Sequence, residues 1–281
     1  MIEYAFDNSA LSCLGEMVSV EAFARRALAS NSRILVPYPV LCEFVDGSSE
    51  ERAVEGFSRL KALRELIGTR LVVSANLPEI LSVEGRGSAL QRTPRLQGDE
   101  GRAVSLALKP GPLDIQGFRR VRNGLKEYLA KDVALEKDKS ARQHVPWDPD
   151  DNPQVHEGIV GSLRAFALSK RHPFFDTITG KHKYNVRSLS KHPEEFPSAV
   201  MYLAYTLLVM TGAAFVATQT TSGVVCPPRW GSWVDAKIAA CAARARWFVS
   251  NDREQRNKIA EVAGKFLLGI RPISLDDWVN I

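Results

Sequence analysis

The chain has 281 residues, of which 45% are hydrophobic and 25% are charged, and its formal net charge is +5. This is enough apolar material for one large domain or two small ones. The four cysteines are widely spaced, with no CxxC pair and no histidine at zinc-finger spacing, which excludes a disulfide-stapled scaffold and a zinc finger. No basic and apolar signal segment opens the sequence, so we expect a cytoplasmic protein with reduced cysteines.

Short apolar runs alternate with helical patterns over residues 1–85. The predicted strands are 2–6, 33–37 and 70–73, and the predicted helices are 11–29, 38–45 and 53–67. Strands that alternate with helices favour a parallel sheet. We therefore predict an α/β fold whose first half is built here.

The same alternation returns near the carboxyl terminus. The predicted helices are 235–245 and 256–268, and the predicted strands are 246–250 and 270–273. We interpret residues 1–85 and 230–281 as the two halves of one α/β core, with residues 86–229 inserted between them.

The predicted insertion has a different character. Pro and Gly clusters interrupt its helical patterns, which cover 99–108, 117–135, 155–169 and 198–217. It carries 21 Lys and Arg against 14 Asp and Glu, a balance of +7, whereas the flanking parts are slightly acidic. A mostly helical, basic insertion fits a polyanion-binding region. The same charge also fits an ordinary solvated surface.

Four acidic residues adjoin the ends of the predicted elements: Asp7, Glu43, Asp235 and Asp252. Asp7 and Asp252 lie at the carboxyl ends of predicted strands, and sites in parallel sheets form outside the carboxyl ends of strands. Clustered carboxylates repel one another and need a cation. Their oxygens suit Mg²⁺ or Mn²⁺, which activate water and clamp phosphate oxygens. The pattern predicts a divalent-metal site for phosphodiester hydrolysis.

Each acid also has a structural interpretation. Asp7, Asp235 and Asp252 could each cap the helix that follows, because an Asp side chain accepts hydrogen bonds from free backbone N–H groups. Glu43 lies among apolar residues, where an unpaired carboxylate is costly, so the functional interpretation is stronger there.

These residues and their neighbours resemble the PIN-domain nuclease family. The resemblance is carried by FDNS at 6–9, VP at 36–37 with LCE at 41–43, and DAKIAACA at 235–242 with FVSND at 248–252. It covers roughly 1–85 and 226–281, and it implies a three-layer α/β/α domain. By this resemblance, Asp7, Glu43, Asp235 and Asp252 bind one or two Mg²⁺ or Mn²⁺ ions, supported by Asn8, Ser250 and Asn251.

Family members usually lack so large an insertion, which leaves the substrate open. Some relatives have a Gly and an acid at a helix start as the third ligand, so Asp99 or Glu100 is an alternative to Asp235. The implied activity is metal-dependent hydrolysis of nucleic acid, most often as an endoribonuclease acting on RNA. With this activity, the protein could be a toxin controlled by an inhibitory protein partner, or a defence component. The alternative is a catalytically inactive PIN-like scaffold that binds nucleic acid or a protein partner.

A run of basic and aromatic residues at 170–192 is a candidate contact with nucleic acid, through Lys181, Lys183 and Arg187. A solvated loop is the alternative. Arg187 and His192 also have the Arg-x4-His spacing of HEPN ribonucleases, but Pro193 disfavours the helix that this motif needs. The histidines of this run lack the close spacing of a zinc site.

Residues 199–217 are apolar over the length of a membrane span. Their Ala-rich faces, with interspersed Tyr and Thr, favour a buried helix packed against the sheet or in a homodimer interface. We therefore expect no membrane attachment.

Overall fold

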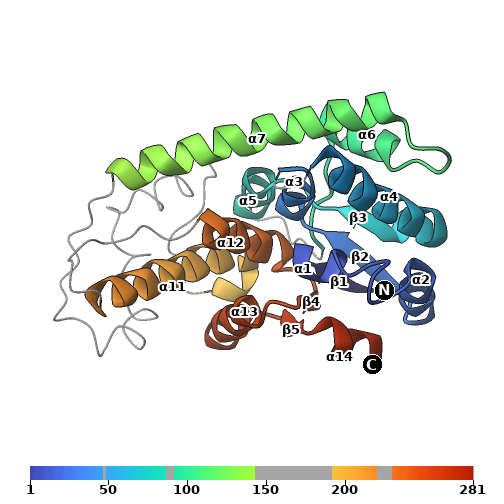
Figure 1. Cartoon of the computed structure of the whole chain (residues 1–281). Coiled ribbons are helices and arrows are strands. Elements are labelled where there is room, and N and C mark those ends of the chain that lie inside the picture. Colours follow the sequence, from blue (N-terminus) through green and yellow to red (C-terminus); the bar gives the residue numbers. More distant parts are fainter. Residues whose placement is uncertain (47–48, 87–91, 143–191, 220–229, 281) are drawn as a thin grey trace.

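A computed structural model describes residues 1–46, 49–86, 92–142, 192–219 and 230–280. Its centre is a five-stranded sheet in the order β3-β2-β1-β4-β5, in which every neighbouring pair is parallel (Figure 1). The strands are β1 Ile2–Phe6, β2 Ser32–Val36, β3 Leu71–Val73, β4 Trp247–Val249 and β5 Arg271–Ile273. The predicted α/β fold with a parallel sheet is confirmed.

The sheet brings the two ends of the chain together at its centre. Phe6 in β1 is level with Val249 in β4, and the backbone N–H of Asp7 donates to the Val249 carbonyl at 3.1 Å. The carboxyl ends of β1 and β4 are therefore adjacent. Asp7 and Ser250, the residues that follow these strands, lie at the same edge of the sheet.

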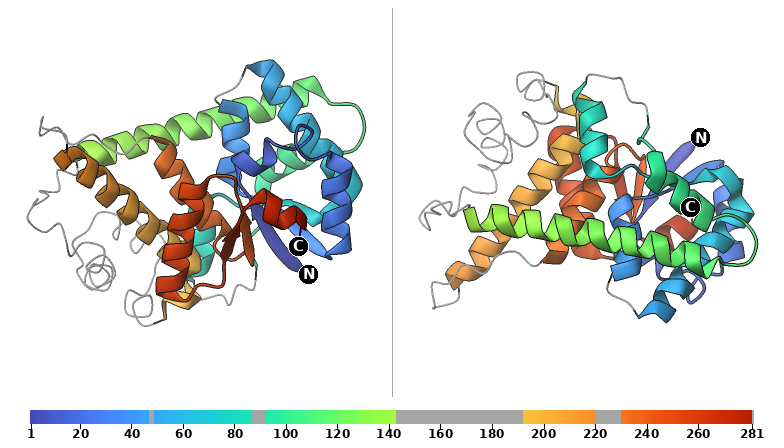
Figure 2. Two further views of the ribbon diagram at one scale, coloured as in Figure 1. Left: turned by 60° about the horizontal axis from the view of Figure 1, so that its bottom comes forward. Right: turned by 90° about the horizontal axis from the view of Figure 1, so that it is seen from above.

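Helices connect the strands and lie on both sides of the sheet. The connections contain α1 Asn8–Leu11, α2 Val20–Ala29, α3 Tyr38–Asp46, α4 Glu50–Ile67, η1 Gly68–Arg70, α5 Leu77–Gly85, α12 Trp230–Ala242, α13 Arg253–Phe266 and α14 Leu275–Asn280. Helix α2 packs against α4 and β2, whereas α13 packs against β5. The left view of Figure 2 shows the sheet between α2 and α13, whereas α14 lies on the side of α2, where the Phe23 and Trp278 rings are 4.5 Å apart.

The described part of the middle segment is helical. It contains α6 Gly98–Ala107, α7 Ile115–Arg142, η3 Pro193–Glu195 and α11 Pro197–Gln219. Helix α7 packs on α3 and α6, and α11 packs on α12, α13 and α5 (Figures 1 and 2). Buried side chains from α6, α7 and α11 join the same hydrophobic cluster as the strands. This part of the segment therefore shares the core of the α/β unit.

A buried ion pair fixes the start of α11 against the core. Glu84, at the end of α5, accepts hydrogen bonds from the backbone N–H groups of Ser198 and Ala199 at 3.2 and 3.0 Å. The same carboxylate lies 2.8 Å from Nη2 of Arg244, in the connection between α12 and β4. Among the described residues, α11 included, no helix is long and apolar enough to cross a membrane.

Two of the predicted helices begin or break elsewhere. The helix expected over 11–29 begins only at Val20, as α2, and Leu11 is instead the last residue of α1. Gly15 takes a φ of +85° in the intervening turn, and Ser19 caps α2 by accepting from the N–H of Ala22. The helix expected from Asp235 begins at Trp230. Helices α5 and α14 were not predicted.

Candidate functional site

Asp7 lies at the carboxyl end of β1 and is the N-cap of α1. Its Oδ1 accepts from the N–H of Ala10 at 2.8 Å, and its Oδ2 accepts from the hydroxyl of Ser250 at 2.6 Å and of Ser9 at 2.8 Å. The side chain is only 4% exposed. Burial raises the pKa of Asp7, and these hydrogen bonds oppose the rise by stabilising the ionised form.

Asp252 is the third residue after β4 and caps α13. Its Oδ1 accepts from the N–H of Gln255 at 3.0 Å, and its own N–H donates to Oγ of Ser250 at 3.0 Å. Because Ser250 also donates to Asp7, this serine joins the two strand-end acids. Asp7 and Asp252 therefore each cap a helix and also belong to the candidate site.

Glu43 and Asp235 come from helix interiors instead. Each is the sixth residue of its helix, in α3 and α12 respectively, and these two helices pack against each other. The interpretation of Asp235 as a helix cap is wrong, because α12 begins five residues earlier. Both side chains are partly buried.

Electrostatic interactions link Glu43 to Asp235 and Asp7, and Asp235 to Asp252 and Asp7. Burial raises the pKa of Glu43 to about 7, with further contributions from the charges of Asp235 and Asp7. Burial likewise raises the pKa of Asp235 to about 7, followed by the charge of Asp252, while Lys258 acts in the opposite direction. The ion pairs of the described part of the chain include none of the four acids.

Gln255, in the first turn of α13, connects Asp252 at the strand end with Asp235 in the interior of α12. Its side chain is 3% exposed, and its Nε2 donates to Oδ1 of Asp235 at 3.4 Å while its backbone N–H binds Asp252. Sequence analysis missed this residue. Its position three residues after Asp252, directly before the helix predicted over 256–268, was the available signal.

The predicted supporting residues have different positions. Ser250 contacts Asp7, as described above, whereas Asn251 uses its side chain to bind Sγ of Cys13 at 3.3 Å and the N–H of Leu275 at 3.3 Å. Asn251 therefore ties α14 to the loop after α1. Asn8 is the first residue of α1, beside Asp7.

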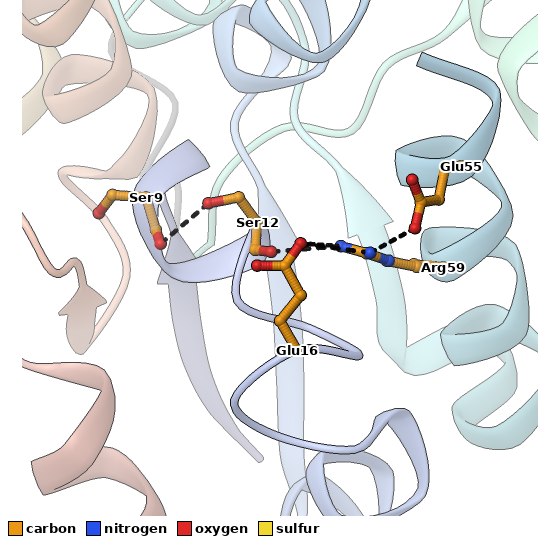
Figure 3. A network of polar contacts seen from close by, with 5 residues as sticks. All are labelled: Ser9, Ser12, Glu16, Glu55 and Arg59. Carbon is orange, nitrogen blue, oxygen red and sulfur yellow. Dashed lines mark hydrogen bonds and ion pairs between the residues drawn. The ribbon is translucent and has the colours of Figure 1, made fainter. Parts of the chain in front are cut away.

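Ser9 extends the site toward α4. Its hydroxyl accepts from the N–H of Asn251 at 2.8 Å, and its carbonyl accepts from the hydroxyl of Ser12 at 3.2 Å. Figure 3 shows how Ser12 in turn contacts Arg59, which pairs with Glu55 at 2.6 Å and Glu16 at 3.4 Å. This network anchors the short helix α1 and with it the cap formed by Asp7.

The alternative third acids lie elsewhere. Asp99 is exposed and 3.8 Å from Arg102, and Glu100 accepts from the hydroxyl of Tyr38 at 3.4 Å. Neither is among the charges that act on Glu43 or Asp235. Lys181, Lys183 and Arg187 lie outside the described residues.

The donor chemistry of the site fits a hard divalent cation, since it consists of carboxylate, hydroxyl and amide oxygens. In the described part of the chain, however, no three His, Cys, Asp or Glu side chains are placed to hold one ion together. Mg²⁺ commonly keeps several waters and binds one or two carboxylates. A hydrated ion would therefore need only two of the acids as ligands.

Tyr205 and Lys258 also belong to these surroundings and were not predicted. Tyr205, in α11, is fully buried and interacts electrostatically with Asp235, Asp252 and Asp7. Nζ of Lys258, in α13, lies 5.8 Å from the centre of the Tyr205 ring. The middle segment thus contributes a side chain to the surroundings of the acids.

In comparisons with known proteins, no family model, no curated protein and no solved structure matches the chain. The likeness to PIN-domain nucleases therefore stays a resemblance of the quoted segments.

Proposed function

We propose that the chain is a metal-dependent phosphodiesterase, a nuclease with a PIN-like three-layer α/β/α domain, and that its substrate is RNA. The observation that carries this proposal is the pair Glu43 and Asp235. Burial raises the pKa of each to about 7, with further contributions from Asp235 and Asp7 for Glu43, and from Asp252 and Asp7 for Asp235. Two partly buried carboxylates without an ion-pair partner are unfavourable unless a cation joins them.

In this proposal Glu43 and Asp235 hold Mg²⁺ or Mn²⁺, with Asp7 and Asp252 beside them. The ion, when bound, lowers the pKa of a coordinated water and neutralises charge on the phosphate. Ser250 orients Asp7 through its 2.6 Å hydrogen bond, and Gln255 orients Asp235. No side chain has to attack the phosphate itself.

The test is cleavage of labelled single-stranded RNA and DNA by the full chain in EDTA, Mg²⁺ or Mn²⁺. We expect Mn²⁺- or Mg²⁺-dependent cleavage that Glu43→Gln and Asp235→Asn each reduce at least about 100-fold, since each removes a ligand charge. Asp99→Asn is the matched control, because this exposed acid lies away from the site. It should retain full activity.

Two results would contradict the proposal. Cleavage that persists in EDTA, or that survives both Glu43→Gln and Asp235→Asn, would separate the activity from these acids. Loss of activity in Asp99→Asn with retention in Asp235→Asn would instead move the third ligand to the start of α6.

The second candidate is a PIN-like scaffold that binds nucleic acid or a protein partner without cleaving it. One observation favours it: within the described ranges no three acids are placed to share an ion, and Asp7 and Asp252 are both engaged as helix caps. Binding of RNA with equal affinity in EDTA and Mn²⁺, without turnover in either, would support this candidate over the nuclease.

A further inference from the structure

Three basic residues of α7 gather around one exposed carboxylate at the start of α4. Nε of Arg119 donates to Oε1 of Glu50 at 2.8 Å, and Nη1 of Arg122 lies 3.5 Å from Oε2 of the same side chain. Lys126 follows Arg122 by one helical turn and therefore faces the same side of α7. The hydrogen bond and the charge of Arg119, followed by the charges of Arg122 and Lys126, lower the pKa of Glu50. Arg119, Arg122 and Lys126 form the α7 basic stripe.

The charges of this cluster do not balance. One carboxylate faces three cations, and the side chains of Glu50 and Arg119 are 44% and 61% exposed. Arg59 on α4 has the opposite arrangement, because a single guanidinium lies between the carboxylates of Glu16 and Glu55 (Figure 3). The α7 basic stripe therefore carries a positive charge that Glu50 neutralises only in part.

The neighbouring residues keep this excess positive. Residues 115–128 of α7 include four basic residues and one acid. Beside Glu50, the first turn of α4 carries Glu51 and Arg52, whose charges cancel. The stripe spans seven residues of helix, a length of about 10 Å. An open row of cations on a helix surface needs no cavity, and it suits a chain of phosphates better than one small anion.

Glu50 indicates which chemical group the stripe recognises. Each of its two oxygens is engaged by a different arginine of α7. Guanidinium groups bind the oxygens of phosphate in the same way as those of carboxylate. Because an exposed ion pair contributes little to stability, a phosphate can take the place of Glu50 at little cost.

The stripe lies beside a helix that carries one of the four acids. Helix α7 packs on α3, and the ring centres of Tyr128 in α7 and Tyr38 in α3 are 5.0 Å apart. Glu43 belongs to α3, and Glu50 follows the last residue of that helix by four positions. Figure 1 shows α7 running above α3 along the upper side of the molecule. A chain bound to the stripe is thus held next to α3.

We propose that the α7 basic stripe binds the phosphate backbone of single-stranded RNA, and that Glu50 competes with the RNA for Arg119 and Arg122. The inference takes its ligand, RNA, from the proposed function, but it requires no metal ion. It gives the middle segment a role, since α7 holds the substrate beside the α/β core and Glu50 limits the affinity. Phosphate contacts of this kind position a chain without reading its sequence.

The test is binding of a fluorescein-labelled oligouridine of about 20 nucleotides to the full chain in EDTA, measured by fluorescence anisotropy at several salt concentrations. Arg119→Gln and Lys126→Gln should each weaken binding about 3- to 10-fold. Each should also reduce the slope of log affinity against log salt concentration by about 0.7, the value for one phosphate contact on a single strand. Glu50→Gln should strengthen binding about 3- to 10-fold, because it frees both arginines.

Glu261→Gln and Lys265→Gln are the charge-matched controls. These two residues form a 3.1 Å ion pair on α13, which lies on the opposite side of the molecule from α7 (Figure 1). Each control should leave the RNA affinity within about twofold of the wild type. The substitutions at Glu50 and Arg119 alter an exposed pair, so their melting temperatures should stay within about 3 °C of the wild type.

The outcomes separate this inference from the proposed function. Wild-type affinity in Arg119→Gln, or equal gains in Glu50→Gln and Glu261→Gln, would overturn the role of the stripe. Polyglutamate of the same length that displaces the probe as well as unlabelled oligouridine does would assign the surface to an acidic protein instead. Binding in EDTA that depends on Arg119, without Mn²⁺-dependent cleavage, keeps this inference and removes the nuclease. Cleavage by a chain whose RNA binding is indifferent to Arg119→Gln does the reverse.

Discussion

Replacement of Glu43 by glutamine should stabilise the metal-free protein, and the gain should grow as the pH rises. Burial and the charges of Asp235 and Asp7 raise the pKa of Glu43 from 4.5 to about 7. Because the folded-state pKa is the higher one, folding favours the protonated group. The contribution of protonated Glu43 to the free energy of unfolding is fully present below about pH 4.5, and it is lost as the pH rises through about 7.

The size of the effect follows from the pKa values. A rise from 4.5 to about 7 corresponds to about 3 kcal/mol of unfolding free energy lost once Glu43 is ionised. Asp235 shares this repulsion, so the substitution should recover about 1–3 kcal/mol at pH 8. Near pH 4 the two proteins should differ by only a few tenths of a kcal/mol, because Glu43 is then uncharged in both states.

Urea unfolding in EDTA, followed by tryptophan fluorescence from pH 4 to pH 8, measures the difference. Asp99→Asn serves as the exposed control and should lie within about 0.5 kcal/mol of the wild type throughout. Addition of Mn²⁺ should reverse the order at pH 8, since an ion that binds only the folded wild type stabilises it. A difference that does not vary with pH, or a Glu43→Gln variant that is less stable at pH 8, would refute the electrostatic reasoning.

Five further substitutions, at four positions, test other parts of the structure by the same unfolding measurement. Asp252→Ala should cost about 1 kcal/mol because the cap of α13 is lost, whereas Asp252→Asn keeps an oxygen for the cap and should cost only a few tenths while removing the charge. Glu84→Ala should cost about 3 kcal/mol, since it removes the carboxylate that pairs with Arg244 and leaves two N–H groups of α11 without an acceptor. Gly101→Ala should destabilise by about 1–3 kcal/mol because its Cβ would lie 2.7 Å from the Leu96 carbonyl oxygen. Gly124→Ala, with nothing within 4 Å, should instead stabilise α7 by about 0.5–1 kcal/mol. Destabilisation by Gly124→Ala, or a neutral Gly101→Ala, would contradict the packing of these helices.

Local patterns were sufficient to predict the sheet and two of the four acids. Asp7 and Asp252 follow apolar strands, and a parallel sheet brings such strand ends to one edge whatever the intervening sequence does. Local patterns do not predict that β1 and β4 are neighbours, because the chain between them is long. The order of the acids in the sequence, and not any periodicity, indicated that pairing.

The remaining site residues depend on contacts that local patterns do not contain. Asp235 was expected at a helix start because the residues before it, Trp230 to Val234, were not interpreted as helical. Tyr205 lies in an apolar run where any residue is expected to face the core, and only the packing of α11 on α12 and α13 brings it near the acids. Gln255 likewise acquires its role from a tertiary contact with Asp235.

The hydrogen bonds of the four acids divide them into two pairs with different tasks. Asp7 uses both carboxylate oxygens on protein donors, and Asp252 uses one to cap α13, so folding alone accounts for their presence. Within the described ranges Glu43 accepts no hydrogen bond, and Asp235 accepts a single one at 3.4 Å. Helix interiors offer them nothing to cap, and burial with like charges raises both pKa values. Among the described residues these two acids cap no helix and form no ion pair, so a ligand that compensates their charge is the simplest physical reason for their place in the fold.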